Sequence, residues 1–175
     1  MMYEGYPFIF QMNDYSEIVH ELHLYTMQYR FKSTKSNHKY IVRVECYEDH
    51  AYCVKFFDKA NMLSDNKFSL RTGTYEARTI MFTVFRIMLD VLKRDPKASF
   101  FFIGAHDERD ERDVPTRRFR VYKTFTLSVV SDKLFEHRDI NEKSLYILIN
   151  KESVADPAAY AERINQYVAE AYGEE

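Results

Sequence analysis

The sequence predicts one α+β domain, in which an antiparallel or mixed sheet of about four to six strands packs with three helices. Two segments carry this prediction: residues 40 to 57 alternate between apolar and polar side chains, and residues 74 to 94 are apolar at helical spacing. Only four Gly and four Pro occur, which favours long regular elements over a sandwich of many short strands. No linker or repeat interrupts the chain, so we expect residues 1–175 to form a single domain.

The first half of the chain carries most of the strand signals. Residues 6 to 12 alternate weakly, and residues 24 to 31 are aromatic and lean toward a strand. The clearest alternation places four residues on one sheet face: Tyr40, Val42, Val44 and Cys46. The pattern resumes at Tyr52 and continues to Phe57, so we expect a hairpin with a four-residue loop over 48 to 51.

This hairpin makes a prediction about the two cysteines. If Tyr47 pairs with Tyr52, Cys46 lies directly opposite Cys53 on the neighbouring strand. A reducing compartment would keep both as thiols. We therefore interpret them as two small buried residues on one sheet face and not as a redox pair.

Residues 74 to 94 predict a central helix that is largely buried. Its polar residues form one thin stripe at steps of three and four: Glu76, Thr79, Thr83, Arg86, Asp90 and Lys93. The remaining circumference is apolar, so the helix should lie between the sheet and a second layer, either another helix or a second subunit. Thr72 or Thr74 can cap its start, and Asp95-Pro96 ends it.

Three further elements follow. Ser99 to Ile103 predicts a short buried strand closed by Gly104, and Ser144 to Asn150 predicts another strand. Asp156-Pro157 is an N-cap followed by proline at the first helical position. The helix that it opens carries one apolar face and ends at Gly173; that face holds Tyr160, Ile164, Tyr167, Val168 and Ala171.

The segment from Thr116 to Ser131 fits two structures. As a strand it alternates between apolar and polar residues, and β-propensity favours that structure. As a helix it presents one apolar stripe after a start signal at Pro115-Thr116. We expect the helix, for the reason given with the resemblance below.

A basic cluster in this segment is the candidate anion site: Arg117, Arg118, Arg120 and Lys123. In the helical form these residues occupy the first two turns, where backbone N–H groups and guanidinium forks both suit phosphate oxygens. The alternative is that they pair with the acidic residues of the preceding loop, between Asp107 and Asp113. Charges also alternate with aromatics at residues 29 to 32, a pattern typical of stacking platforms for single-stranded nucleic acid and of ordinary half-buried strands.

His106, Asp107 and Glu108 are the only catalytic candidates, because they directly follow a predicted buried strand. Together they have the groups needed for acid–base or metal chemistry, yet no second part of a triad accompanies them. The sequence has no Gly-rich phosphate loop, nucleophile elbow or zinc-ligand spacing. We therefore expect no metal and no cofactor, and the balance favours a protein that is not an enzyme.

Charge and hydropathy set the expected surroundings of the protein. The net charge of −2 gives no global attraction to nucleic acid or anionic membranes, so any anion site must be local. No segment approaches the roughly 18 apolar residues of a membrane span. The first residues lack the basic start of a secretory signal. We expect a cytoplasmic protein without a membrane partner.

The segment Thr116-Arg117-Arg118-Phe119-Arg120-Val121-Tyr122 resembles a Thr/Arg-Arg-x-Arg-x-Tyr motif of a group of small bacterial proteins of unknown function. In that group, a strand meander, a long apolar helix and a short strand precede the motif, which opens the next helix. The resemblance covers about residues 25 to 150 and implies the fold and the helical form of this segment. It implies no activity, since none is established for the group.

Three functions remain open. The first is a small binding module that associates with a protein partner or with itself through apolar surface near the central helix. It would also contact an anionic ligand or nucleic acid through its arginines. The second is a phosphate-ester hydrolase or nuclease that uses His106 and its neighbouring carboxylates. The third is a structural accessory subunit of a larger assembly.

Overall fold

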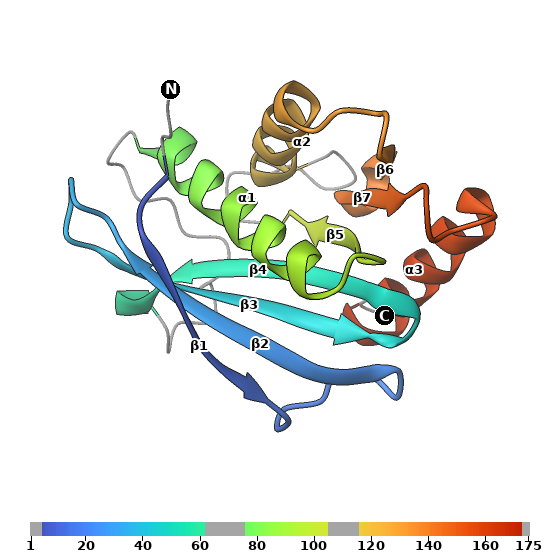
Figure 1. The fold of residues 1–175 in the computed structure, drawn as a ribbon, viewed down its shortest axis with the longest axis horizontal. Coiled ribbons are helices and arrows are strands. Elements are labelled where there is room, and N and C mark those ends of the chain that lie inside the picture. The colour runs from blue at the N-terminus through green and yellow to red at the C-terminus, as the bar shows by residue number, and fades with distance from the viewer. Residues whose placement is uncertain (1–4, 62–75, 105–115, 173–175) are drawn as a thin grey trace.

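The computed structural model describes residues 5–61, 76–104 and 116–172, and within them the fold is α+β, as predicted. The sheet is mixed and has seven strands: β1 (Phe8–Asp14), β2 (His23–Lys32), β3 (Lys39–Tyr47), β4 (Ala51–Asp58), β5 (Ser99–Ile103), β6 (Phe135–Ile140) and β7 (Leu145–Asn150). The three helices are α1 (Ala77–Arg94), α2 (Arg117–Val129) and α3 (Pro157–Tyr172). Figure 1 shows α1 and α2 on the near side of the sheet.

The strand order is β1-β2-β3-β4-β5-β7-β6. The first four strands form an antiparallel meander, and α1 connects β4 to a parallel β5. The prediction of four to six strands missed β6. This edge strand has the sequence Phe-Glu-His-Arg-Asp-Ile, and its charged residues hide the apolar alternation that marks a buried strand.

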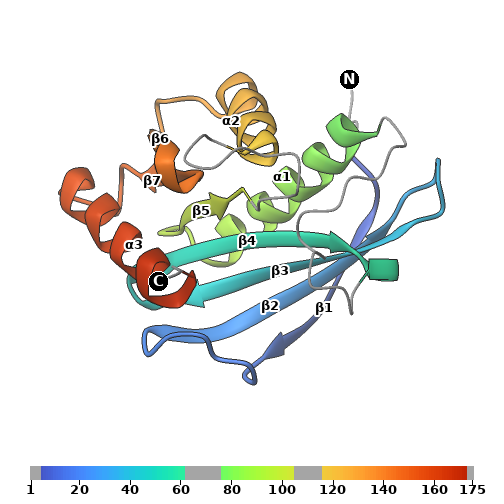
Figure 2. The same cartoon turned by 180° about the vertical axis from the view of Figure 1, so that it is seen from behind.

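The two faces of the sheet bury separate apolar clusters. The inner face is the one covered by α1 and α2, and its cluster includes Val42, Val44, Phe100 and Ile87. The outer face is the opposite one, where α3 packs on one end through Tyr167 and other residues of a second cluster. In Figure 2 this helix lies in front of the sheet.

Helix α1 is largely buried, as its sequence predicts, and its cover is another helix of the same chain. The Phe82 and Phe125 rings meet edge to face with centroids 4.9 Å apart, so α2 supplies the second layer. Thr83, assigned to the polar stripe, is buried, and its hydroxyl oxygen accepts a 2.7 Å hydrogen bond from the Tyr6 N–H. The proposed caps Thr72 and Thr74 lie outside the described residues.

The predicted β3–β4 hairpin is present, but its register differs by one residue. The connection is the three-residue turn Glu48–His50, so Tyr47 pairs with Ala51 and Cys46 pairs with Tyr52. Backbone φ angles of 66° and 60° at Asp49 and His50 close the turn one residue early.

This register corrects the prediction about the cysteines. Cys46 belongs to the inner cluster and Cys53 to the outer cluster, so the two thiols are on opposite faces of the sheet. Both are free and buried, and burial raises the pKa of each thiol.

The segment after residue 115 is a helix, in agreement with the structure expected for it. The Thr116 hydroxyl caps α2 by accepting a 3.1 Å hydrogen bond from the Phe119 N–H. A Cβ atom at Gly104 would lie 2.5 Å from that hydroxyl, so the end of β5 can approach the start of α2 only with glycine at this position. Likewise, Asp156 caps α3 as predicted, through a 3.2 Å hydrogen bond from the Ala159 N–H.

None of the helices in the described ranges is both long enough and apolar enough to cross a membrane.

Candidate anion-binding site

The outer face of the sheet extends beyond α3 over β2 and β3, and polar side chains occupy it. Because side chains alternate along a strand, the register of β2 and β3 sets the cross-strand neighbours on this face. From one end to the other, the pairs are Lys32 with Lys39, Arg30 with Ile41, Gln28 with Arg43, and Thr26 with Glu45. The Gln28–Arg43 and Thr26–Glu45 pairs belong to an ion-paired surface. The Lys32–Lys39 and Arg30–Ile41 pairs belong to a basic one.

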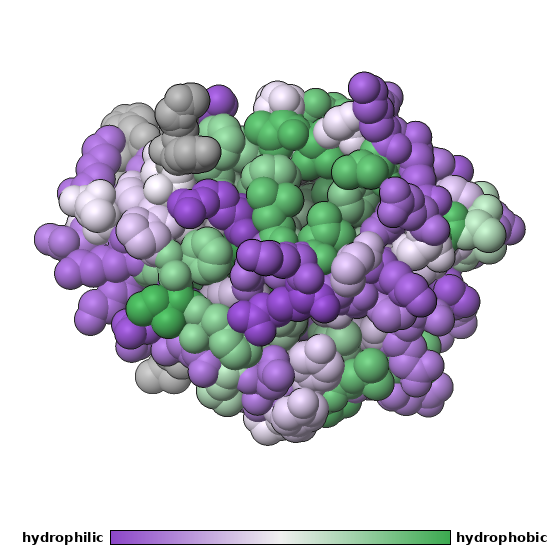
Figure 3. All heavy atoms as spheres, viewed as in Figure 1, coloured by the Kyte–Doolittle hydropathy of each residue, from purple (hydrophilic) through white to green (hydrophobic). Residues whose placement is uncertain are grey.

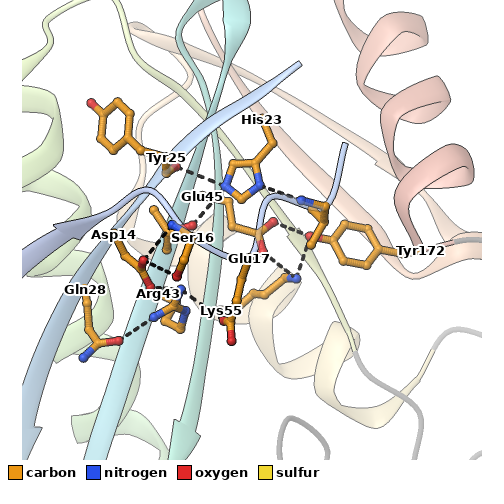
Figure 4. Close-up of polar contacts among 12 residues, drawn as sticks. Asp14, Ser16, Glu17, His23, Tyr25, Gln28, Arg43, Glu45, Lys55 and Tyr172 are labelled. Atoms are coloured by element: carbon orange, nitrogen blue, oxygen red, sulfur yellow. Dashed lines mark hydrogen bonds and ion pairs between the residues drawn. The ribbon is translucent and has the colours of Figure 1, made fainter. Parts of the chain in front are cut away.

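Near α3 the charged groups neutralise one another, and Figure 4 shows their contacts. Arg43 donates to an Asp14 carboxylate oxygen at 3.0 Å and to the Gln28 amide oxygen at 2.5 Å. Glu17 lies 3.7 Å from the same guanidinium. Hydrogen bonds from Ser16, followed by the one from Arg43, lower the pKa of Asp14 to about 2.

The neighbouring ion pair, between Glu45 and Lys55, includes a carboxylate that is buried. Glu45 is only 7% exposed, and the Lys55 ammonium lies 2.9 Å from one of its carboxylate oxygens. The same ammonium donates to the Tyr172 hydroxyl at 2.6 Å and sits 3.9 Å from the centre of its ring. The Tyr172 hydroxyl in turn donates to Glu45, so the two carboxylate oxygens are both bonded. We call these six residues the paired network: Asp14, Gln28, Arg43, Glu45, Lys55 and Tyr172.

His23 borders the paired network as a neutral side chain. The Val19 N–H donates to its Nδ1 atom at 3.1 Å, so that nitrogen carries no proton. The other ring nitrogen, Nε2, therefore carries the proton. It lies 2.9 Å from the Thr26 hydroxyl oxygen and 3.1 Å from the Tyr25 carbonyl oxygen, both of which can accept it. Burial lowers the pKa of His23, although the nearby Glu45 carboxylate acts in the opposite direction.

At the end of the sheet away from α3, the outer face is hollowed and basic. A hollow of about 670 Å³ is lined by four cations, Arg30, Lys32, Lys39 and Lys59, and we call it the basic hollow. Its other lining includes amide and apolar side chains: Gln11, Gln28, Asn37, Ile9 and Ile41. In Figure 2 this end carries the turn between β2 and β3.

Among the described residues, nothing neutralises the cations of the basic hollow. Within the described ranges, no Asp or Glu lines it, and its four cations make no ion pair. Lys32 and Lys39 are directly opposite on neighbouring strands, where the Cβ atoms lie about 5 Å apart and like charges destabilise the sheet. Asp58 is next in sequence to Lys59 but does not line the hollow, because its carboxylate lies 2.7 Å from His38 and accepts the Ala60 N–H. An external anion would therefore relieve this repulsion.

Sequence reasoning noticed part of this site but assigned it differently. Charges alternate with aromatics at residues 29 to 32, and the structure sends the two sets to opposite faces. Tyr29 and Phe31 are buried in the inner cluster, so they offer no stacking platform. Arg30 and Lys32 point into the basic hollow. Lys39 and Lys59 carried no local signal, because the β2–β3 register and the end of β4 bring them there.

Two of the four predicted anion-binding residues of α2, Arg118 and Lys123, contact different strands of the sheet. Arg117 begins the helix, and its side chain is outside the described part of the structure. Arg118 is half-buried against Phe56 of β4. Arg120 is exposed, and Lys123 pairs with Asp139 of β6. The function of these residues stays a prediction, and Arg118 is considered again below.

The predicted catalytic candidates His106, Asp107 and Glu108 lie outside the described residues. In the ranges that are described, no three His, Cys, Asp or Glu side chains gather closely enough to hold a metal ion.

A second surface is apolar. A groove between α1 and the end of α2 is lined by residues such as Phe85, Leu89, Val129 and Leu134, and Leu89 and Leu134 are about half exposed. Figure 3 shows hydrophobic residues gathered on this side of the molecule, where Figure 1 places the two helices. This groove is an exposed apolar surface near the central helix, and its use by a protein partner or a second copy stays a prediction.

Comparison with models of protein families, with curated proteins and with solved structures finds no match to this chain. The function is therefore inferred from the geometry and chemistry of its own residues.

Proposed function

We propose that this protein is a binding module without catalysis and that its basic hollow holds a phosphate-rich polymer, namely single-stranded nucleic acid. The observation that carries the proposal is the uncompensated set of cations on one sheet face. Lys32 and Lys39 repel each other directly across two strands, and Arg30 and Lys59 line the same hollow. Groups that break a local rule of stability without a gain elsewhere are characteristic of functional sites.

The lining of the basic hollow suits a single strand better than a duplex. At about 670 Å³ it has the size of a ligand site and is concave, whereas duplex readers insert a protruding helix or ribbon into a groove. Cations on its rim can contact phosphates, and the amides of Gln11 and Asn37 can hydrogen-bond to base edges. Because the whole chain carries a charge of −2, attraction to the polymer would be local and sensitive to salt.

Fluorescence anisotropy with a labelled single-stranded oligonucleotide tests the proposal. Four phosphate contacts predict a slope of about −3 when the logarithm of the binding constant is plotted against that of the salt concentration. The Lys32→Ala/Lys39→Ala double variant keeps two cations and should reduce the slope to about −1.4. A matched control, Lys97→Ala/Lys143→Ala, removes two exposed lysines outside the hollow and should leave the slope unchanged.

Two results would contradict this function. One is an oligonucleotide affinity that is equal in the hollow variant and in the control variant. The other is equal competition by polyglutamate of the same charge, because this would show that the hollow selects an acidic polymer of any kind and not nucleic acid.

A further inference from the structure

A second site, separate from the basic hollow, lies where β4 and β5 diverge. These parallel strands pair over only three residues: Ala51 with Ser99, Tyr52 with Phe100, and Cys53 with Phe101. Strand β4 then continues to Asp58, whereas β5 ends at Ile103. The carboxyl ends of parallel strands are common ligand positions in mixed sheets, because the diverging backbones leave a crevice there.

A pocket of about 150 Å³ occupies this divergence. Its walls come from β4, β5, α2 and the end of α3: Val54, Lys55, Phe56, Ile103, Arg118, Tyr122 and Tyr172. The lining is mainly apolar and aromatic, and it contains two cations and two phenol hydroxyls. An engineered apolar cavity of about 150 Å³ binds benzene, so this pocket has room for a ligand with an apolar body of that size and one polar group at its edge.

The two cations of the pocket differ in their partners. The Lys55 charge is compensated by Glu45 at 2.9 Å. Arg118 is half-buried, donates to the Phe56 carbonyl oxygen at 3.3 Å, and lies 4.5 Å from the centre of the Phe56 ring. Among the described residues, no carboxylate pairs with Arg118. The guanidinium has five N–H donors in a planar fork, and it lies over the Phe56 ring at the wall of the pocket.

We propose that this pocket binds a small carboxylate with an apolar body, which the guanidinium of Arg118 anchors. A carboxylate matches the planar guanidinium fork with two parallel hydrogen bonds. The apolar body would lie against Val54, Phe56 and Ile103. Free phosphate suits the pocket less, because the oxygens that the guanidinium does not bind would face a mainly apolar lining and lose hydration there.

Calorimetric titration with acetate, butyrate and benzoate tests this site, with benzamide as the neutral match for benzoate. Affinity should rise from acetate to benzoate as more apolar surface is buried. Benzoate should bind about tenfold or more tightly than benzamide, because only the charged group completes the pair with Arg118. Arg118→Gln should remove this preference. Arg138→Gln replaces an exposed arginine that already pairs with Glu136, and it should keep the preference.

A measurement on the unmodified protein removes dependence on how the variant folds. Benzoate should shift the methyl NMR signals of Val54 and Ile103, which line the pocket. The same shifts should occur in the Lys32→Ala/Lys39→Ala variant, since the basic hollow is a different site. The proposal is overturned if none of the three carboxylates moves these signals, if benzamide binds as tightly as benzoate, or if inorganic phosphate binds more tightly than benzoate.

Discussion

The paired network and the basic hollow occupy the same face of the sheet, yet only the first neutralises its cations. In the network, Arg43 meets Asp14 and Lys55 meets Glu45. Two to four residues further along the same strands, Arg30, Lys32 and Lys39 have no such partner among the described residues. Position along one strand pair thus separates cations that are ion-paired within the fold from cations that have no carboxylate partner among the described residues.

The difference also follows burial. Charges close to α3 are removed from water, and a buried charge without a partner destabilises a fold by several kcal/mol, about 3–5 in measured cases. Charges in the basic hollow remain hydrated, so their repulsion costs only about 0.2–1 kcal/mol per cross-strand pair. A protein can therefore keep an unpaired basic surface at the exposed end of a sheet with only a small loss in its free energy of unfolding.

The largest expected effect is at the buried end. Replacing Lys55 by Met leaves the Glu45 carboxylate buried with hydroxyl partners only, and it should lower the free energy of unfolding by about 2–4 kcal/mol. The estimate is below the fully buried range because the Lys55 side chain keeps some solvent contact. Urea unfolding measures the change. Lys39→Met is the matched control, and a loss of similar size in both variants would remove the distinction between the two ends.

An intermediate effect concerns pH. Burial lowers the pKa of His23 below its ordinary value of 6.5, in the field of Glu45, Lys55 and Arg43. Protonation is therefore harder in the folded state, so this contribution to stability is complete above pH 6.5 and is lost as the pH falls below it. The urea midpoint should decrease between about pH 7 and pH 5, and His23→Gln should make the decrease smaller.

The exposed His50 supplies the comparison for that experiment, since His50→Gln should keep the decrease of the wild-type protein. If His23→Gln and wild type lose stability in parallel with decreasing pH, the neutral state of His23 is not what stabilises this end of the sheet.

The smallest effect on stability is at the basic end, and it has the opposite sign. Lys39→Glu places a carboxylate directly opposite Lys32 and should raise the free energy of unfolding by about 0.2–1 kcal/mol at low salt. The same substitution should weaken oligonucleotide binding, because it introduces repulsion of phosphate into the basic hollow. Unfolding and anisotropy measured on one preparation check both effects. A variant that loses stability and affinity together would contradict the assignment of these lysines to binding.

Local patterns in the sequence predict most of the elements but not the site. The alternation around Val42 and Val44, the apolar stretch of α1 and the Asp156 cap depend on neighbouring residues, and each is present as expected. The turn closed by Asp49 and His50 shifted the register by one, which no alternation pattern detects.

The basic hollow needed information that is not local. Lys39 meets Lys32 through the register of two strands, and Lys59 reaches the same hollow from the end of β4. The α2 segment had the opposite property: its cations are adjacent in sequence, but helical geometry turns Arg118 toward β4 and Lys123 toward β6. Density of charge along the chain therefore does not show which cations share one face of the fold, because strand register and helical geometry decide that.

The one-residue register of the β3–β4 hairpin has a consequence for following the protein as it opens. Cys46 is sealed in the cluster beneath α1 and α2, and Cys53 in the cluster beneath α3. Burial raises the pKa of both thiols, so each reacts with an alkylating reagent only when its own cluster admits solvent. The chain thus carries one reporter thiol on each side of its sheet. The ratio of the two labelling rates shows which helical layer detaches first.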